Sequence, residues 1–139
     1  MNEARAKTKY AFEERWAPAL KKDGHVQVST FFLKNYHQLQ PYPLTHGEAM
    51  FVIHLMQHKW GADAPFPAYR TLAERMGVSV KTARRFAASL QQKRYLHREY
   101  RIGATNLFYL DKLMAALVAL KNRGPRQPKK QLPERRRKT

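Results

Sequence analysis

The sequence predicts a mainly α-helical protein of the α+β class, with one small β-hairpin and extensions at both ends. Within residues 69–110 the apolar positions fit a helix, a tight turn, a second helix and two short strands. Residues 46–60 are apolar almost all round, which is typical of a helix buried on several sides. Residues 121–139 are rich in cations and interrupted by proline, which predicts a disordered tail.

Residues 1–43 are predicted to form an N-terminal extension of helices with one strand. A helix is expected over residues 3–15, which are rich in Ala, Lys, Arg and Glu, because Pro18 breaks the pattern soon afterwards. We expect this helix to be anchored by three apolar side chains, Phe12, Trp16 and Leu20.

The second half of the extension begins with a predicted turn at Asp23-Gly24. Residues 25–29 alternate between polar and apolar types and predict a short strand. A helix over residues 31–39 follows, with Ser29 or Thr30 as its N-cap. The segment Gln-Pro-Tyr-Pro at residues 40–43 is a predicted linker.

The helix over residues 46–60 begins with the spacing of a capping box, Thr45 followed by Glu48. Because its apolar residues surround the axis, it must pack on the two later helices and on a further element. The N-terminal extension is the nearest candidate for that element.

The turn between the next two helices is well specified. Pro67 or Ala68 begins the first of these helices, and Leu72, Ala73 and Met76 form its inner face. Gly77 can adopt the left-handed conformation that ends a helix. Ser79 then stands where an N-cap is needed.

The second of these helices, residues 80–93, has two distinct faces. Its inward positions are predicted to be Ala83, Ala87, Leu90 and Arg94, with Val80 and Phe86 at the margins. Its outward positions are Lys81, Arg85, Ala88 and Gln92, flanked by Thr82 and Arg84.

Two short strands are expected at residues 95–100 and 107–110, joined by residues 101–106. Gly103 permits a tight turn between them, and Arg98 and Arg101 are expected near the tip.

The segment Leu-Ala-Glu-Arg-Met-Gly-Val-Ser at residues 72–79, followed by Thr82, Arg85, Leu90 and Leu96, resembles the winged helix-turn-helix domains of bacterial and phage regulators and replication initiators. Residues 93–96 match the family's sequence pattern at the start of the first wing strand, and residues 106–110 resemble the returning strand. Arg94 is a departure, since relatives often have Gly there. The resemblance covers about residues 44–110 and implies a winged helix-turn-helix.

The resemblance implies binding to double-stranded DNA, with residues 80–93 as a recognition helix in the major groove. Base contacts are expected from Lys81, Arg85 and Ala88, where Arg85 can pair bidentately with guanine. Phosphate contacts are expected from Tyr69, Arg70, Thr82, Arg84, Arg98 and Arg101. The alternative is a helical hairpin with a solvated, charged outer face.

The composition agrees with a polyanionic partner. The 139 residues carry 27 Lys and Arg against 10 Asp and Glu, a formal net charge of +17 that creates a field attracting nucleic acid or an acidic membrane surface. No apolar run approaches the roughly 20 residues of a spanning helix, and no signal peptide is recognisable. With no Cys, disulfides and thiolate zinc sites are excluded. We expect a cytoplasmic, nucleoid-associated protein.

The predicted disordered tail, residues 124–139, holds much of this charge. It is expected to follow DNA phosphates, the alternative being a solubilising or vestigial tail. The cations concerned are Arg126, Lys129, Lys130, Arg135, Arg136, Arg137 and Lys138.

A last helix is expected within residues 111–123, capped by Asp111 and stopped by Gly124-Pro125. Its apolar stripe either folds onto its own domain or forms a homodimer interface, and the dimer is slightly favoured. The stripe consists of Leu113, Leu117 and Leu120.

Catalytic and metal chemistry have little support in the sequence. His54 and His58 are four residues apart on a helix, but neither the metalloprotease glutamate nor a third ligand accompanies them. No metal, cofactor or small-molecule ligand is expected, and no enzymatic activity. The function predicted is sequence-specific transcriptional regulation. The alternatives are a plasmid- or phage-type replication initiator or partition protein, and an architectural nucleic-acid or RNA-binding adaptor of low specificity.

Overall fold

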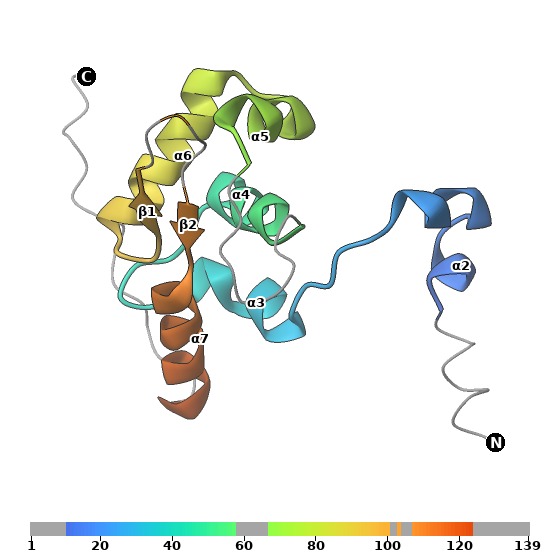
Figure 1. The fold of residues 1–139 in the computed structure, drawn as a ribbon. Helices are drawn as coiled ribbons and strands as arrows, with labels where there is room; N and C mark the ends of the chain where they lie inside the picture. The colour runs from blue at the N-terminus through green and yellow to red at the C-terminus, as the bar shows by residue number, and fades with distance from the viewer. Residues whose placement is uncertain (1–10, 58–66, 101–102, 104–106, 124–139) are drawn as a thin grey trace, which may run out of the picture.

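The computed structural model describes residues 11–57, 67–100, 103 and 107–123. The described part is mainly helical with one two-stranded antiparallel sheet, as predicted (Figure 1). Its elements in chain order are α2 (Phe12–Arg15), the 3-10 helix η1 (Pro18–Asp23), α3 (Thr30–Asn35), the 3-10 helix η2 (Tyr36–Gln38), α4 (His46–Gln57), α5 (Tyr69–Met76), α6 (Val80–Gln92), β1 (His97–Glu99), β2 (Leu107–Tyr109) and α7 (Asp111–Arg123).

Helices α4, α5 and α6 pack against one another and form the centre of the protein. Helix α4 buries most of its surface, as its all-round apolar sequence predicts, although Met50 stays exposed. Gly47 allows α4 to approach α6 closely, because a Cβ on this residue would lie 2.6 Å from the ring of Phe86. The buried side chains of α4 are Glu48, Ala49, Phe51, Val52 and Leu55.

The turn between α5 and α6 has the predicted geometry. Gly77 ends α5 in the left-handed conformation, with φ 70° and ψ 33°. Ser79 caps α6, and its hydroxyl oxygen accepts the backbone N–H of Thr82 at 3.0 Å. Leu72 and Ala73 are buried, and Met76 is half-buried beside them. The prediction of a helix, a tight turn and a second helix is confirmed.

The two strands pair antiparallel, with Arg98 opposite Phe108. The paired segments are shorter than predicted, because Tyr95 and Leu96 enter the core before the ladder begins. Gly103 has φ 75°, as a turn between the strands requires. Residues 101–102 and 104–106 lie outside the described part.

Helix α7 corrects the prediction that its leucine stripe forms a homodimer interface. Leu113, Leu117 and Leu120 are buried in the core of their own chain. The physical reason is local: Leu110 joins β2 directly to α7, so the helix begins against an apolar surface that its stripe covers. Met114 and Val118 remain exposed on α7, outside this stripe.

The chain before α4 divides into two parts with different outcomes. Phe32, Leu39 and Leu44 join the core, so this part of the N-terminal extension packs near α4 as predicted. The expected helix over residues 31–39 is instead α3 followed by η2, and Ser29 caps α3 through the N–H of Phe32. We call residues 30–57, 67–100, 103 and 107–123 the body.

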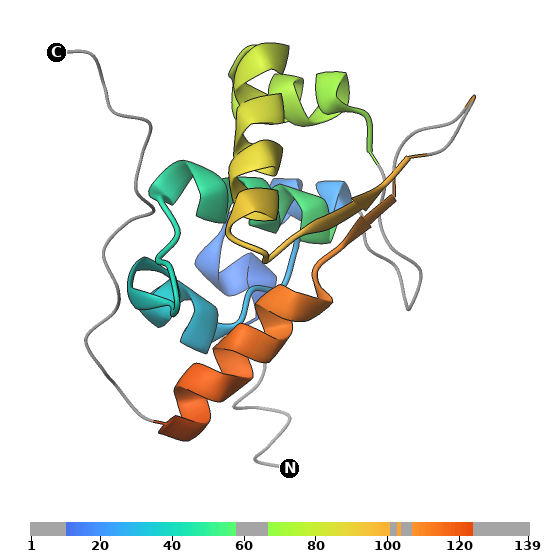
Figure 2. The ribbon, with the colours of Figure 1, turned by 90° about the vertical axis from the view of Figure 1, so that its left-hand side faces the viewer.

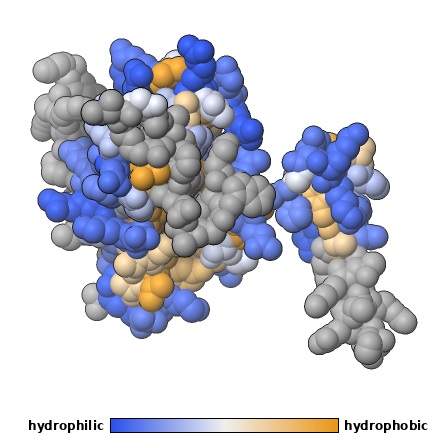
Figure 3. All heavy atoms as spheres, in the orientation of Figure 1, coloured by the Kyte–Doolittle hydropathy of each residue, from blue (hydrophilic) through white to orange (hydrophobic). Residues whose placement is uncertain are grey.

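Residues 11–23, which we call the N-terminal arm, lie apart from the body (Figure 1). The three predicted anchors are not buried: Trp16 is 63% exposed, Leu20 is 45% exposed, and Phe12 is half-buried against Trp16 and His25. Apolar side chains therefore lie on the surface of this separate segment (Figure 3).

Two further predictions in this region are wrong or reach beyond the described part. Residues 25–29 form no strand, and among the described residues only β1 and β2 pair into a sheet. The helix expected over residues 3–15 is described only from Phe12, and residues 1–10 lie outside the described part. None of the described helices combines the length and the apolar character needed to cross a membrane.

Candidate nucleic-acid interface

Helix α6 separates a buried apolar face from an exposed basic one. Ala83, Ala87 and Leu90 are at most 1% exposed, and the two small alanines let α6 pack closely on α4 and α5. The three predicted base-contact residues, Lys81, Arg85 and Ala88, are all exposed on the other face, as is Arg84. No acidic residue occurs between Glu74 and Glu99 in the sequence. The exposed face of α6 therefore has no carboxylate of its own to neutralise its cations.

The beginning of α6 is fixed by side chains that the sequence already indicated. The Ser79 hydroxyl donates to Thr82 Oγ1 at 3.0 Å while accepting the Thr82 N–H. The Thr82 hydroxyl hydrogen remains able to donate to another group. Thr82 is thus half-buried in the cap, with one donor left for a phosphate oxygen.

A cluster of aromatic rings and guanidinium groups joins α5, α6 and the sheet. Arg98 Nη1 donates to the Tyr69 hydroxyl at 2.9 Å, and the Arg84 guanidinium lies 5.5 Å from the centroid of the Tyr69 ring. The Arg98 guanidinium also lies 4.8 Å from the centroid of the Tyr100 ring. Three predicted phosphate-contact residues, Tyr69, Arg84 and Arg98, are therefore neighbours.

Tyr100 is a member of this cluster that the sequence prediction missed. It is 76% exposed, and it follows β1 directly, two residues after Arg98, the spacing at which extended residues share a side. This two-residue spacing was the available signal. Glu99 points to the other face, where its carboxylate accepts the Tyr109 hydroxyl at 3.0 Å.

The remaining predicted phosphate contacts do not join the cluster. Arg70 is exposed at the start of α5. Arg98, the cluster member expected near the tip of the hairpin, is half-buried in the middle of β1 opposite Phe108, where its guanidinium contacts Tyr69 and Tyr100. Arg101 lies outside the described residues, and so do the tail cations Arg126, Lys129, Lys130, Arg135, Arg136, Arg137 and Lys138.

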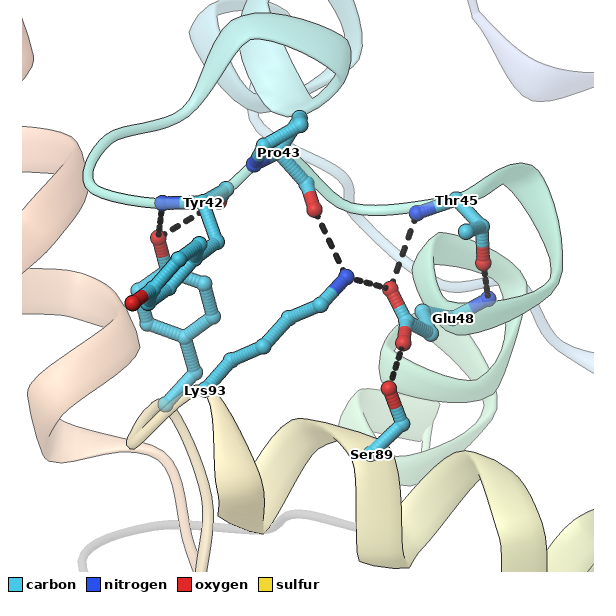
Figure 4. A network of polar contacts seen from close by, with 7 residues as sticks. Tyr42, Pro43, Thr45, Glu48, Ser89 and Lys93 are labelled. Carbon is cyan, nitrogen blue, oxygen red and sulfur yellow. Dashed lines mark hydrogen bonds and ion pairs between the residues drawn. The ribbon is translucent and has the colours of Figure 1, made fainter. Parts of the chain in front are cut away.

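A buried ion pair fixes the end of α6 relative to α4 (Figure 4). Lys93 Nζ donates to Glu48 Oε1 at 2.7 Å and to the Pro43 carbonyl oxygen at 2.7 Å. The Ser89 hydroxyl donates to the other carboxylate oxygen of Glu48. Ser89 and Lys93, about one helical turn apart, are therefore both bonded to Glu48 at the start of α4.

The same carboxylate completes the predicted capping box. The Thr45 N–H donates to Glu48 Oε1 at 2.9 Å, and the Glu48 N–H donates to Thr45 Oγ1 at 3.1 Å. The capping box was visible in the sequence. The partnership with Lys93 was not, because it joins residues 45 apart in the chain.

At the end of α6 the buried residue is Lys93, whereas helical spacing predicts Arg94. Arg94 was expected on the inner face of α6, yet it is exposed and adopts φ 68°, while Lys93 is buried. The helix has already ended at Gln92, and the N–H groups of Arg94 and Tyr95 donate to the carbonyls of Gln91 and Leu90, both at 2.9 Å. This is the Schellman pattern, in which the left-handed residue is usually Gly.

Tyr95 joins the segment after α6 to the segment before α4. Its hydroxyl donates to the Tyr42 carbonyl oxygen at 2.6 Å and accepts the Tyr42 N–H at 3.1 Å. Burial, with a smaller contribution from the Glu48 carboxylate, raises the pKa of Tyr95 to about 12, against the lowering effect of the Tyr42 hydrogen bond. The ring therefore stays neutral at physiological pH.

The described residues contain no group of three or more His, Asp or Glu side chains that could hold a metal ion. His54 is half-buried on α4, and His58 lies outside the described residues.

A three-helix core, a capped outer helix with basic residues and a following antiparallel hairpin define a winged helix-turn-helix, a class of DNA-binding module. Comparison with protein families agrees: residues 42–96 match the family model described as a helix-turn-helix domain. No curated protein matches the chain.

Proposed function

We propose that the protein binds a specific sequence of double-stranded DNA and regulates transcription, acting by binding and not by catalysis. The observation that carries the proposal is the exposed face of α6, where Lys81, Arg85 and Ala88 are free of the core and no carboxylate lies on the helix. In helix-turn-helix proteins this face enters the major groove. A cytoplasmic location close to the nucleoid follows from this partner.

The proposal assigns different roles to the two arginines of α6. Arg85 lies on the outward stripe with Lys81 and Ala88, so its guanidinium is placed to pair with guanine O6 and N7. Arg84 is turned toward Tyr69 and its cluster, which favours a phosphate contact. Ala88 is small enough to approach a thymine methyl group.

The aromatic and guanidinium cluster supports a backbone contact beside the recognition helix. Arg98 is oriented by Tyr69 and Tyr100 before any ligand arrives, so less side-chain entropy is lost on binding. The sequence of the tail adds seven cations that can follow phosphates, which would increase affinity for all duplexes alike.

Selection of duplexes from a random pool tests the proposal. The wild type should enrich one motif, and Arg85→Ala should relax one base-pair position per bound copy, since a bidentate contact is worth about 1–3 kcal/mol of discrimination. Arg84→Ala is the matched control and should weaken all sequences similarly. If Arg85→Ala leaves the selected motif intact, α6 does not select the sequence.

Direct repeats in the selected motif would favour a replication initiator over a regulator, and equal binding to unrelated duplexes would favour an architectural protein.

A further inference from the structure

A groove lies between the end of α6 and α7. Its lining includes Gln92 at the end of α6, Arg94 just after this helix, and Lys112 and Arg123 near the two ends of α7. Its α7 wall is made of small side chains, Ala115, Ala116 and Ala119. A ligand can approach the helix backbone closely along such a wall.

The groove carries positive charge with no carboxylate among the residues that line it. Lys93 also lines it, but its ammonium group is buried and bonded to Glu48. Arg94, Lys112 and Arg123 are exposed, and Arg123 makes a long hydrogen bond of 3.4 Å to the Gln40 side chain. Asp111 lines a neighbouring hollow with His97, Tyr109 and Lys112, so Lys112 is shared by the two hollows. Three cations therefore face an anionic ligand without a competing acid in the lining.

The groove continues the exposed stripe of α6. Lys81, Arg85, Ala88 and Gln92 follow one another at helical spacing, and Gln92 is also part of the groove. Figure 2 shows α6 and α7 on the same side of the molecule, one beyond the end of the other. A long polyanion lying along α6 would pass over the groove.

We infer that this groove binds the phosphate backbone of the same duplex that α6 contacts, through Arg94, Lys112 and Arg123. The inference rests on the proposed function. It extends the DNA-binding surface beyond the recognition helix and the hairpin to α7, and it makes the bound duplex longer on the α7 side. The groove contributes affinity and salt dependence but no base selection, because its cations meet only phosphate oxygens.

Salt dependence of binding tests the inference with two double variants of equal charge. Lys112→Gln with Arg123→Gln removes two groove cations, and Lys22→Gln with Lys34→Gln removes two exposed cations on η1 and α3. Each lost phosphate contact lowers the slope of log affinity against log salt by about 0.9. The groove variant should therefore lose about 1.8 from this slope with its selected motif unchanged, and the control variant should keep the wild-type slope.

A second measurement localises the contact along the duplex. Trimming the selected duplex from one end should weaken the wild type before the motif is reached, whereas the groove variant should tolerate the same trimming. Equal slopes and equal trimming profiles for the groove and control variants would overturn the inference. Loss of binding to a polyglutamate peptide with DNA affinity unchanged would overturn it in favour of an acidic protein partner.

Arg85→Ala, measured in parallel, separates this inference from the proposed function. If Arg85→Ala changes the selected motif while the groove variant behaves as its control, the function stands and only the groove assignment fails. If the wild type selects no motif, the proposed sequence specificity fails, and the salt slopes still report whether the groove contacts DNA.

Discussion

Two lysine–glutamate pairs, one in the body and one in the N-terminal arm, have similar lengths and opposite surroundings. The Lys93–Glu48 pair is 2.7 Å long, and its side chains are 3% and 4% exposed. The Lys21–Glu13 pair is 2.5 Å long, and its side chains are 63% and 33% exposed. Distance alone would rank the second pair above the first. The environment reverses that order, because water screens an exposed pair and cannot replace a missing partner in a buried one.

The partners of each pair show what it can stabilise. Glu48 accepts hydrogen bonds from Thr45, Ser89 and Lys93, and Lys93 also donates to the Pro43 carbonyl. This network joins α4 to α6 and so holds the proposed recognition helix in place. The arm pair joins residues only 8 positions apart within one separate segment, so it can order only that segment.

The largest effect is expected from Lys93→Met. Removing the ammonium leaves the Glu48 carboxylate buried without its cation, and breaking a buried pair in this way costs about 3–5 kcal/mol. Chemical denaturation should show that loss in the free energy of unfolding. The matched change in the arm, Lys21→Met, should leave the unfolding midpoint of the body unchanged.

A double variant separates the buried charge from the lost contacts. Glu48→Gln combined with Lys93→Met removes both charges and keeps an amide that can still serve the capping box. It should recover a large part of the stability that Lys93→Met loses. A double variant no more stable than the single one would show that the hydrogen bonds of Lys93, and not the unpaired carboxylate, account for the loss.

The same contrast should hold for two leucines. Leu113→Ala removes a fully buried side chain from the core and should cost about 2–5 kcal/mol, whereas Leu20→Ala in the arm should change stability by less than about 0.5 kcal/mol. Thermal unfolding at several protein concentrations checks both values. A melting temperature that rises with concentration would show that association of two copies, and not packing within one chain, contributes to the stability.

The contrast also explains how far the sequence predicts the fold. Capping residues and helical spacing predict α4 to α6 well, because Thr45, Gly77 and Ser79 act on backbone groups a few residues away. Spacing cannot say which element covers an apolar stripe. The stripes of α7 and of the arm look alike in sequence, yet Leu117 is buried in the chain's own core and Trp16 is exposed.

In the candidate site, too, local features are predictable from the sequence and long-range contacts are not. The outward positions of α6 are predicted correctly, since they are simply the face opposite Ala83 and Ala87. The contact of Arg98 with Tyr69 and the α7 side of the groove are not predictable, because each depends on residues brought together from distant parts of the chain. Helical spacing also fails at Arg94, where a left-handed residue ends the period.

The smallest effect is expected from Glu13→Gln in the arm. The Lys21 hydrogen bond, aided by a backbone hydrogen bond, holds the pKa of the Glu13 carboxyl below its ordinary value. A depressed pKa favours the ordered arm at pH values above the ordinary pKa, and this contribution is lost as the pH falls through the depressed value. Because the Glu13 side chain is partly exposed and the arm lies apart from the body, the unfolding midpoint of the body should not change. An NMR titration should show the Glu13 carboxyl titrating at lower pH in the wild type than in Lys21→Gln. A shifted midpoint for Glu13→Gln would show instead that the arm and the body unfold as one unit.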